Sequence, residues 1–534
     1  MGKVINMANM LGVMLDCSRN AVLKVETIKR YADIIKKMGY NTLMLYTEDT
    51  YEIESQPYFG HLRGRYTKQE LKEIDAYCNE IGLELVPCIQ TLAHLATMFK
   101  WQNEYDDIND IDGILLCGAE KTYKLIDDMF ATIYECFTSR KIHIGMDEAN
   151  RLGTGKYHKI NGTRDRFDII NEHLHKVCDL AKKYNFEPII WHDMFYRLAA
   201  NVDTQYDEAN VDKLLEKAQL PENISLMFWE YFSKDADYYK GKFDVLKLFG
   251  RNISFAGTAR SWEGFAPLNK YSIDVNSVSI KACKDNGIDD VLITVWGDDG
   301  SETPHFAVLP TLFHAAEVYR GNNDMNSIKA KFKEITGCGF DDILDIEKLD
   351  EPDEYRECDP SKYMLYNDVF LGQWDYRCKL DDDKYYADLA NKLRNKKDVG
   401  EFGYIFDMYA ALADVLAIKC SYGVKLRKSY KDKDIDSIKM LISDGKDLLD
   451  RLERFYNLYQ ERWFKDNKPH GFEIQDIRLG GLMHRIKSCI VRLEKLVSGE
   501  IAEIPELNEP VLDKFGGHHY WGTLVSQSVI TNKV

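Results

Sequence analysis

The chain has 534 residues, of which 45% are hydrophobic and 12% aromatic, and its formal net charge at pH 7 is −17. This size allows a large core and roughly two to four domains. The acidic balance, without any Lys/Arg-rich run, argues against nucleic acid and anionic membrane surfaces as partners and favours a neutral small molecule.

The N-terminal and cysteine patterns predict a cytoplasmic protein. Residues 1–10 lack the charged, apolar and cleavage regions of a signal peptide, and no apolar run reaches the length of about 18 residues that would suggest a membrane span. The 12 cysteines are scattered singly and form no CxxC pair, which is typical of reduced core cysteines.

From about residue 10 onward, short apolar segments alternate with amphipathic ones. Helical patterns include 25–38, 167–183 and the segment after Thr67, where Thr67 and Glu70 have the spacing of a capping box. Eight segments have the apolar, β-branched and aromatic content of strands covered on both faces: 11–16, 40–46, 83–90, 141–146, 187–191, 224–229, 253–258 and 291–296. This α/β alternation predicts a (β/α)8 TIM barrel. A doubly wound open sheet is the alternative, but no GxGxxG motif follows a strand.

Beyond Cys338 the pattern changes to long helical segments. They cover 385–393, 404–426, 435–464 and 474–497, and their apolar spacing predicts a helical bundle. We therefore expect a catalytic barrel over residues 1–338 and an all-α domain over 339–534. The bundle packs either on the barrel or on a second subunit, so a homodimer through these helices is one expected arrangement. For His518 and His519 in the tail we expect a surface turn rather than a ligand set.

Polar and aromatic residues stand at or just beyond the end of every predicted strand. Because the carboxyl ends of barrel strands meet at one mouth, where barrel active sites lie, we expect these side chains to converge. In chain order they are Asp16 and Arg19; Glu48 and Asp49; Gln90 and His94; Asp147 and Glu148; Trp191, His192 and Asp193; Trp229, Glu230 and Tyr231; Trp262 and Glu263; and Trp296, Asp298 and Asp299.

Two features of this set indicate carbohydrate chemistry. Asp147 and Glu148 can both face one pocket only if the strand ends there and Glu148 lies in the loop, and their repulsion would then leave one carboxyl protonated nearer neutral pH. Four of the eight tryptophans, at positions 191, 229, 262 and 296, fall near the ends of the last four strands and could form walls for a sugar ring. An exposed acidic pair and ordinary core tryptophans are the alternative interpretations.

Three motifs resemble those of family 20 glycoside hydrolases, the β-N-acetylhexosaminidases. The segment from His143 to Glu148 is similar to the H-x-G-G-D-E signature, with Met146 in place of the second glycine. The segment from Asp16 to Asn20 resembles the D-x-x-R-H element, with asparagine in place of histidine. Trp296-Gly297-Asp298 resembles the W-x-E element, with aspartate in place of glutamate. The resemblance covers residues 10–320, and the C-terminal helices look like those of the bacterial exo-acting branch.

The resemblance implies a mechanism in which the 2-acetamido oxygen of the substrate is the nucleophile. Glu148 would be the general acid and base. Asp147 would accept the acetamido N–H and balance the charge of the oxazolinium intermediate, and Tyr231 would donate to the acetamido oxygen.

The resemblance also implies supporting roles for other residues at the strand ends. Arg19 and Asp298 would hold the ring hydroxyls, beside the tryptophan walls. Asp49 and His94 resemble a family Asp–His pair that tunes the general acid, and His143 would support the strand end through hydrogen bonds. No cofactor or metal is implied.

The implied activity is that of an exo-β-N-acetylhexosaminidase acting on terminal N-acetylglucosamine. Whether it also acts on N-acetylgalactosamine is left open by the resemblance.

Three alternatives remain. A barrel glycosidase would use an enzyme carboxylate as nucleophile, for example Glu148 with Glu230 or Glu263. A metal-dependent barrel hydrolase would use His143, Asp147, His192 and Asp193, but it usually has an HxH pair after the first strand, where this chain has Asp16-Cys17-Ser18-Arg19. A non-catalytic sugar-binding protein would need only the tryptophans.

Overall fold

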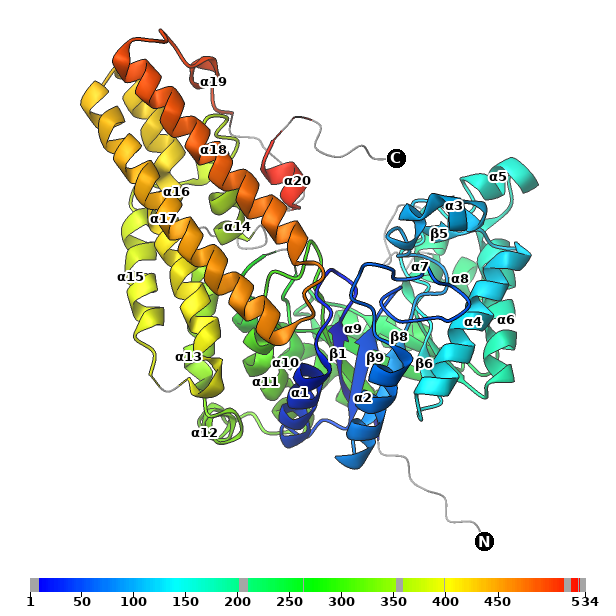
Figure 1. Ribbon diagram of the computed structural model, residues 1–534. Coiled ribbons are helices and arrows are strands. Elements are labelled where there is room, and N and C mark those ends of the chain that lie inside the picture. The colour runs from blue at the N-terminus through cyan, green and yellow to red at the C-terminus, as the bar shows by residue number, and fades with distance from the viewer. Residues whose placement is uncertain are drawn as a thin grey trace.

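A closed barrel of eight parallel strands forms the centre of the computed structural model, which describes residues 9–200, 210–262, 264–351, 359–397, 399–512, 520–526 and 528 (Figure 1). In the order in which they pair, the strands are β1 (Leu11–Asp16), β10 (Val291–Val295), β9 (Ile253–Thr258), β8 (Ser225–Trp229), β7 (Glu187–Trp191), β6 (Lys141–His143), β3 (Glu84–Cys88) and β2 (Thr42–Tyr46). The predicted α/β barrel followed by a helical region is confirmed. The strand expected over 141–146 ends early, at His143.

Helices surround the barrel and connect its strands. The main ones are α1 (Val25–Lys37), α2 (Lys68–Glu80), α4 (Glu120–Cys136), α6 (Arg166–Lys183), α7 (Asp193–Ala199), α8 (Val211–Lys217), α9 (Ala236–Lys247), α10 (Asn269–Asp285) and α11 (Leu309–Tyr319). The capping box at the start of α2 is confirmed: the Glu70 N–H donates to Thr67 Oγ1 at 3.1 Å, and Glu70 Oε2 accepts from the Thr67 N–H at 2.8 Å.

A small lobe rises over one side of the barrel mouth. It contains α3 (Gln102–Tyr105), the hairpin of β4 (Asn109–Ile111) and β5 (Ile114–Leu115), and α5 (Lys156–Asn161). The sequence pattern did not predict these short elements, since each is too short to show a periodicity.

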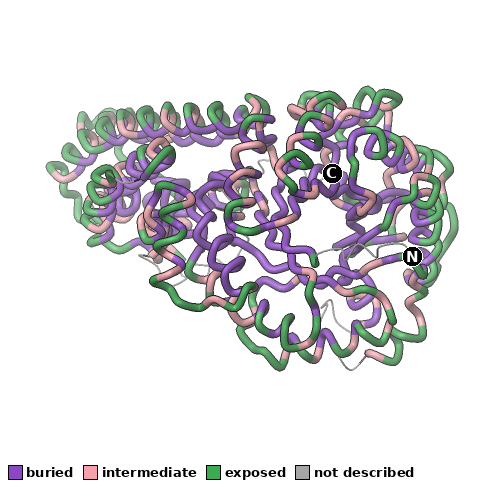
Figure 2. The backbone as a smooth tube through the Cα atoms, turned by 90° about the horizontal axis from the view of Figure 1, so that it is seen from below, coloured by how far each residue is buried: buried purple, intermediate pink, exposed green. Residues whose placement is uncertain are grey.

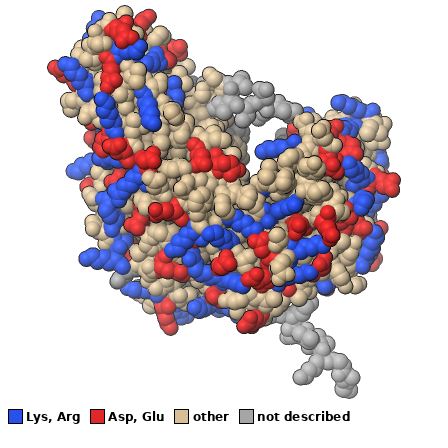
Figure 3. Space-filling model, in the orientation of Figure 1, with Lys and Arg blue, Asp and Glu red and all other residues tan. Residues whose placement is uncertain are grey.

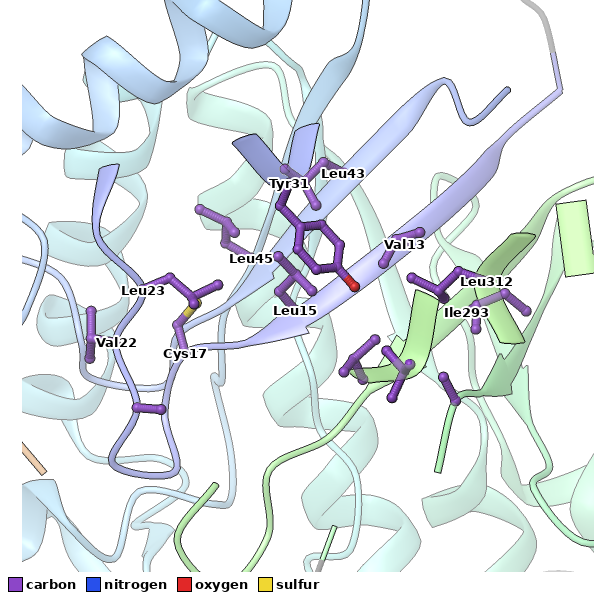
Figure 4. Close-up of a cluster of buried hydrophobic side chains, with 14 of the residues drawn as sticks. Val13, Leu15, Cys17, Val22, Leu23, Tyr31, Leu43, Leu45, Ile293 and Leu312 are labelled. Carbon is purple, nitrogen blue, oxygen red and sulfur yellow. The ribbon is translucent and has the colours of Figure 1, made fainter. Parts of the chain in front are cut away.

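Alternate residues of the strands build two apolar layers. Val13 and Leu15 of β1 point outward to Tyr31 of α1, with Leu43 and Leu45 of β2 beside them (Figure 4). Met14, between them in sequence, belongs instead to a separate cluster. Its other members include Met44, Val86, Cys88, Met227 and Leu292, and Trp229 and Trp296 pack against it. The barrel is therefore filled by an apolar floor on which indole rings rest.

The C-terminal region is helical and packs on the barrel. After α12 (Met325–Thr336), α13 (Phe340–Leu344) and α14 (Pro360–Tyr366) come the long helices α15 (Asp382–Arg394), α16 (Gly403–Lys431), α17 (Ile435–Asp466) and α18 (Phe472–Ser498), then α19 (Pro505–Asn508) and α20 (Trp521–Leu524). Tyr409 of α16 donates to the Phe265 carbonyl, and the Phe265 ring lies 5.8 Å from that of Phe455 on α17. The buried core runs on from barrel to bundle (Figure 2).

No helix in the described part of the chain is long and apolar enough to cross a membrane. On the face shown in Figure 3, acidic and basic side chains are intermingled. His518, His519 and Glu263 lie outside the described residues, so the expectations for them stay untested.

Candidate active site

The residues predicted to converge do meet at the barrel mouth, around a cavity of about 250 Å³. Ten of the twelve predicted site residues line it, and His143 and Asp49 do not. The complete lining is Arg19, His94, Asp147, Glu148, Trp191, Trp229, Tyr231, Phe232, Trp262, Trp296 and Asp298.

The turn after β6 directs both carboxylates into this cavity. Gly145, Met146 and Glu148 have positive φ values of 71°, 73° and 51°. A left-handed conformation costs a non-glycine residue about 1–2 kcal/mol, and such strain is typical of functional sites. Met146, which replaces the motif's second glycine, thus keeps the conformation that glycine favours, and its buried side chain contributes packing that glycine would not.

Asp147 is held as an anion between two donors. Its Oδ2 lies 3.0 Å from His94 Nε2, and its Oδ1 accepts a 2.7 Å hydrogen bond from Gln90 Nε2. Burial opposes the charge, but the His94 cation and these hydrogen bonds hold the pKa of Asp147 below its usual value. Burial likewise opposes the charge on His94, yet the Asp147 carboxylate raises the pKa of that imidazole to about 9.

Glu148 lies at the edge of the cavity, with 43% of its side chain exposed. Its N–H donates to Asp193 Oδ2 at 3.1 Å, and its Oε1 lies 3.2 Å from Arg197 Nη2. Partial burial and the neighbouring Asp147 charge raise the pKa of Glu148 above its usual value. The adjacent carboxyls are therefore shifted in opposite directions, as an acid and a permanent anion require.

Arg19 and Asp298 form a polar part of the cavity wall. Arg19 Nε lies 3.5 Å from Asp298 Oδ1, and Arg19 Nη1 donates to Asp16 Oδ2 at 3.1 Å. Asp16 Oδ2 also accepts the Gly297 N–H at 3.0 Å and so ties the ends of β1 and β10 together. This pair offers donors and acceptors for ring hydroxyls.

The aromatic wall is connected by hydrogen bonds and ring contacts. Trp296 Nε1 donates to Tyr231 Oη at 3.0 Å, so the tyrosine's own proton can serve a ligand. The Tyr231 ring stacks on Trp229 with centroids 5.2 Å apart, and Trp262 lies 5.8 Å away. Trp191 and Trp296 are in ring contact at 6.3 Å.

The predicted Asp49–His94 pair does not form. Asp49 pairs instead with Arg63, and His94 pairs with Asp147. The neighbouring Glu48, in a left-handed conformation, turns toward the site and lies 3.5 Å from Arg19. Adjacent residues point in different directions, and the sequence does not say which of two neighbouring carboxylates faces the mouth.

His143 lies beneath the cavity rather than in its wall. Its Nδ1 accepts the Gly145 N–H at 3.1 Å, and its ring lies 4.2 Å from Trp191. Burial lowers the pKa of His143 to about 3, so the ring is neutral. It thus supports the turn that presents the two carboxylates.

Sequence reasoning missed Arg197, gave no role to Gln90, and considered Asp193 as a metal ligand of the alternative hydrolase rather than as a partner of Glu148. Arg197 Nε pairs with Asp193 Oδ2 at 3.1 Å while its Nη2 reaches Glu148. The Asp193–Arg197 spacing on a helix directly after a strand was an available signal. Gln90 stood at a predicted strand end, and only its contact with Asp147 reveals its role.

The geometry bears on the alternative chemistries. Glu230 Oε1 accepts three backbone N–H groups, from residues 231 to 233, at 2.7–3.2 Å, and Tyr238 donates to its Oε2 at 3.0 Å. It therefore caps a loop and is not presented as a nucleophile.

Among the described residues, the ligand atoms that could share a metal ion belong to His94, Asp147 and Glu148. This set shares only Asp147 with the four residues of the metal-dependent alternative, so those four do not come together as ligands.

Two family models match the chain. Residues 11–244 match "Glycosyl hydrolase family 20, catalytic domain", and residues 340–520 match "Glycoside Hydrolase 20C C-terminal domain". The chain belongs to glycosyl hydrolase family 20. The resemblance seen in the three motifs is thus confirmed, and this family 20 member is a glycoside hydrolase.

Relatives of this family 20 chain are distant. Hexosaminidase D from Bos taurus is 22% identical over 265 residues, which cover 47% of this chain and 71% of that protein. The structure of a GH20 exo β-N-acetylglucosaminidase from Vibrio harveyi in complex with N-acetylglucosamine has a TM-score of 0.47 at 15% identity, over 64% of this chain and 58% of that one. This chain thus spans less than two thirds of the Vibrio enzyme. For the GH20 β-N-acetylhexosaminidase from Streptomyces coelicolor A3(2), the TM-score is 0.44 at 18% identity, over 61% and 69%.

Proposed function

We propose that the protein is an exo-acting β-N-acetylhexosaminidase that releases terminal, non-reducing β-linked N-acetylglucosamine, with N-acetylgalactosamine as a second substrate. The observation that carries this proposal is the acidic pair with oppositely shifted pKa values at the edge of an aromatic cavity. That cavity has room for about one sugar ring.

The reaction would proceed in two steps with retention at the anomeric carbon. In the first, the 2-acetamido oxygen attacks C1, the bond from C1 to the leaving oxygen breaks, and the proton of Glu148 goes to that oxygen. In the second, Glu148 takes a proton from water as the water oxygen attacks C1, and the oxazolinium ring opens.

Asp147 and Tyr231 would serve the nucleophile. Asp147, kept anionic by His94, would accept the acetamido N–H and offset the positive charge that develops on the ring. Tyr231 would donate its proton to the acetamido oxygen and orient it toward C1. Because Glu230 is engaged by its own loop, the nucleophile is assigned to the substrate.

Arg19 and Asp298 would bind hydroxyls of the terminal sugar, and the tryptophans at positions 191, 229, 262 and 296 would surround its apolar face. A cavity of this size accepts one end of a chain rather than its middle, which supports exo action.

The first test compares 4-nitrophenyl N-acetyl-β-glucosaminide with the matching β-glucoside. Wild type is expected to cleave only the first, because the glucoside has no acetamido oxygen. Glu148→Gln is expected to lower kcat by about 10²–10⁴-fold on substrates with poor leaving groups. Asp147→Asn is expected to lose most activity and to bind a thiazoline mimic of the intermediate more weakly. Equal rates for wild type and Glu148→Gln on substrates with poor leaving groups, or turnover of the glucoside alone, would refute the proposal.

Location and assembly are also proposals. The eleven cysteines of the described residues are free and buried, which supports a reducing, cytoplasmic location.

Exposed apolar side chains on α17 and α18, among them Met440 and Ile477, are the surface through which we propose a homodimer. Sedimentation of wild type and Met440→Glu would test it, and a monomeric wild type would exclude it.

A further inference from the structure

A second, larger cavity of about 650 Å³ adjoins the sugar pocket. The two cavities share Arg19, His94 and Glu148 in their walls. Glu148 is the proposed proton donor to the leaving oxygen, so the groups beyond it lie on the leaving-group side of the bond to be cleaved. The second cavity has more than twice the volume of the first, and therefore has room for more than one further sugar.

Two separate parts of the fold supply the walls of this second cavity. Arg478 of α18 and Gly300 after β10 contribute on one side, and Thr97, Asp112 and Arg151 contribute on the side of the small lobe. Figure 3 shows the molecule hollowed between the C-terminal helices and this lobe, which face each other in Figure 1. The C-terminal helical region therefore forms part of the surface that a long leaving group would meet.

The chemistry of this second cavity differs from that of the sugar pocket. Its lining contains no Phe, Tyr or Trp among the residues that the structure describes, so it has no platform for an aryl or lipid group. Apart from Ala93, Ala96, Ile114 and Gly300, its lining residues have amide, hydroxyl or charged side chains, as in Asn20, Asn150 and Thr97. Such groups bind a polyhydroxylated ligand through hydrogen bonds.

The charges on these walls are already neutralised by partners. Arg151 lies 2.7 Å from Asp112, and Arg478 lies 2.7 Å from Asp299 and 2.8 Å from Glu302. Arg63 pairs with Asp49 in the same way. These partners offset the cationic charge, so an anionic sugar gains little attraction from these walls, whereas a neutral sugar can use the donors and acceptors that the pairs leave free.

From the volume, the absence of rings and the paired charges, we propose that the second cavity binds the leaving group and selects a neutral oligosaccharide of at least two sugars. This inference rests on the proposed hexosaminidase function and adds the class of its natural substrate. The C-terminal helices would act in binding through the wall that Arg478 contributes.

The substrate test measures kcat/KM for four substrates that end in the same N-acetylglucosamine. They are the 4-nitrophenyl glycoside, a disaccharide with one neutral sugar as its leaving group, a tetrasaccharide with a neutral trisaccharide leaving group, and a tetrasaccharide whose first leaving sugar is a uronic acid. The value of kcat/KM for the neutral tetrasaccharide is expected to be at least tenfold higher than that for the neutral disaccharide. It is also expected to be at least tenfold higher than that for the uronate-containing tetrasaccharide. No gain with length, or a uronate cleaved as well as the neutral substrate, would overturn the inference.

A steric variant tests the place of binding. Ala96 is exposed and lines the second cavity, so Ala96→Trp is expected to lower the ratio of kcat/KM for the tetrasaccharide to that for the aryl glycoside by about tenfold. Ala131→Trp, at an exposed position on α4, should leave the ratio unchanged. An unchanged ratio in folded Ala96→Trp would contradict the inference. If wild type cleaves none of these substrates, the proposed function itself is refuted.

Discussion

At the scale of single residues, two neighbouring carboxyls differ because their surroundings differ. Asp147 lies between His94 and Gln90, both of which favour its anion, whereas partial burial and the charge of Asp147 both disfavour the anion of Glu148. Arg197 offsets the effect of the Asp147 charge on Glu148, since its guanidinium lies 3.2 Å from Glu148 and lowers the pKa of that carboxyl. Arg197 is therefore a positioning residue that also tunes the acid.

This arrangement predicts a pH effect for Arg197→Met. A general acid works only while protonated, so kcat/KM falls as the pH rises through the pKa of Glu148 in the free enzyme. Removing the Arg197 cation raises that pKa, so the basic limb should move to higher pH. Arg197→Lys keeps the charge and should leave the limb near its original position. A basic limb that moves to lower pH in Arg197→Met would show that Arg197 does not act on Glu148 in this way.

At the scale of elements, the decisive feature is the turn that follows β6. The strand had to end before Asp147 for both carboxylates to face one pocket, and it ends at His143. The left-handed residues Gly145, Met146 and Glu148 then interrupt the extended backbone on which the alternation of side chains in a strand depends. The motif in the sequence indicated this segment, but the contacts that hold it, from His143 and Gln90, are visible only in the fold.

Gly145 is expected to be indispensable in this turn. A Cβ at this position would clash with the side chain of Gln90 and lie 2.9 Å from the Ile89 carbonyl. Gly145→Ala should therefore displace Gln90 from Asp147 and lower kcat by about 10²-fold, with a loss of stability of about 1–3 kcal/mol.

The matched control for this change is Gly480→Ala on α18, where a Cβ meets nothing within 4 Å. It should keep full activity and raise the free energy of unfolding by about 0.4–1 kcal/mol. Steady-state kinetics and urea unfolding of both variants would check the pair. Wild-type kcat in Gly145→Ala would mean that Gln90 has no part in holding Asp147.

At the scale of the whole molecule, a buried ion-pair cluster joins the bundle to the loop after β10. Lys362 of α14 lies 2.7 Å from Asp299 and 2.8 Å from Glu302, and Arg478 of α18 pairs with both carboxylates from the other side. Asp299 directly follows Asp298, which faces the sugar pocket. The helical region thus supports the end of β10 that supplies Trp296 and Asp298.

Breaking this cluster should affect both stability and substrate binding. Lys362 is fully buried, so Lys362→Met leaves two carboxylates short of a partner and should cost about 3–5 kcal/mol of unfolding free energy. KM for the aryl glycoside should rise because Asp298 is less firmly placed. The control Lys281→Met removes an exposed pair with Asp285 and should change stability by less than about 1 kcal/mol. Equal stability of the two variants would show that the cluster does not join the two regions.

The sequence allowed the barrel, the bundle and most of the mouth to be predicted, because strands covered on both faces appear as short apolar runs and their ends fall at one edge. It did not show whether Glu48 or Asp49 faces the barrel mouth, because a shift of one residue in the end of the strand would exchange the directions of the two side chains. It also gave no indication of Lys362 or Arg478, since their partners lie 60 residues or more away in the chain. Local patterns predict elements, while contacts between distant elements depend on the completed packing.

The central claim, that the substrate supplies the nucleophile beside Asp147 and Glu148, is tested most directly by the acyl group of the substrate. We would measure kcat/KM for aryl β-glucosaminides whose N-acetyl group carries zero, one, two or three fluorine atoms. Each fluorine makes the acyl oxygen a weaker nucleophile, so kcat/KM should fall steeply and steadily along the series. A rate that is independent of fluorination would show that the acetamido oxygen does not attack, and would contradict this account.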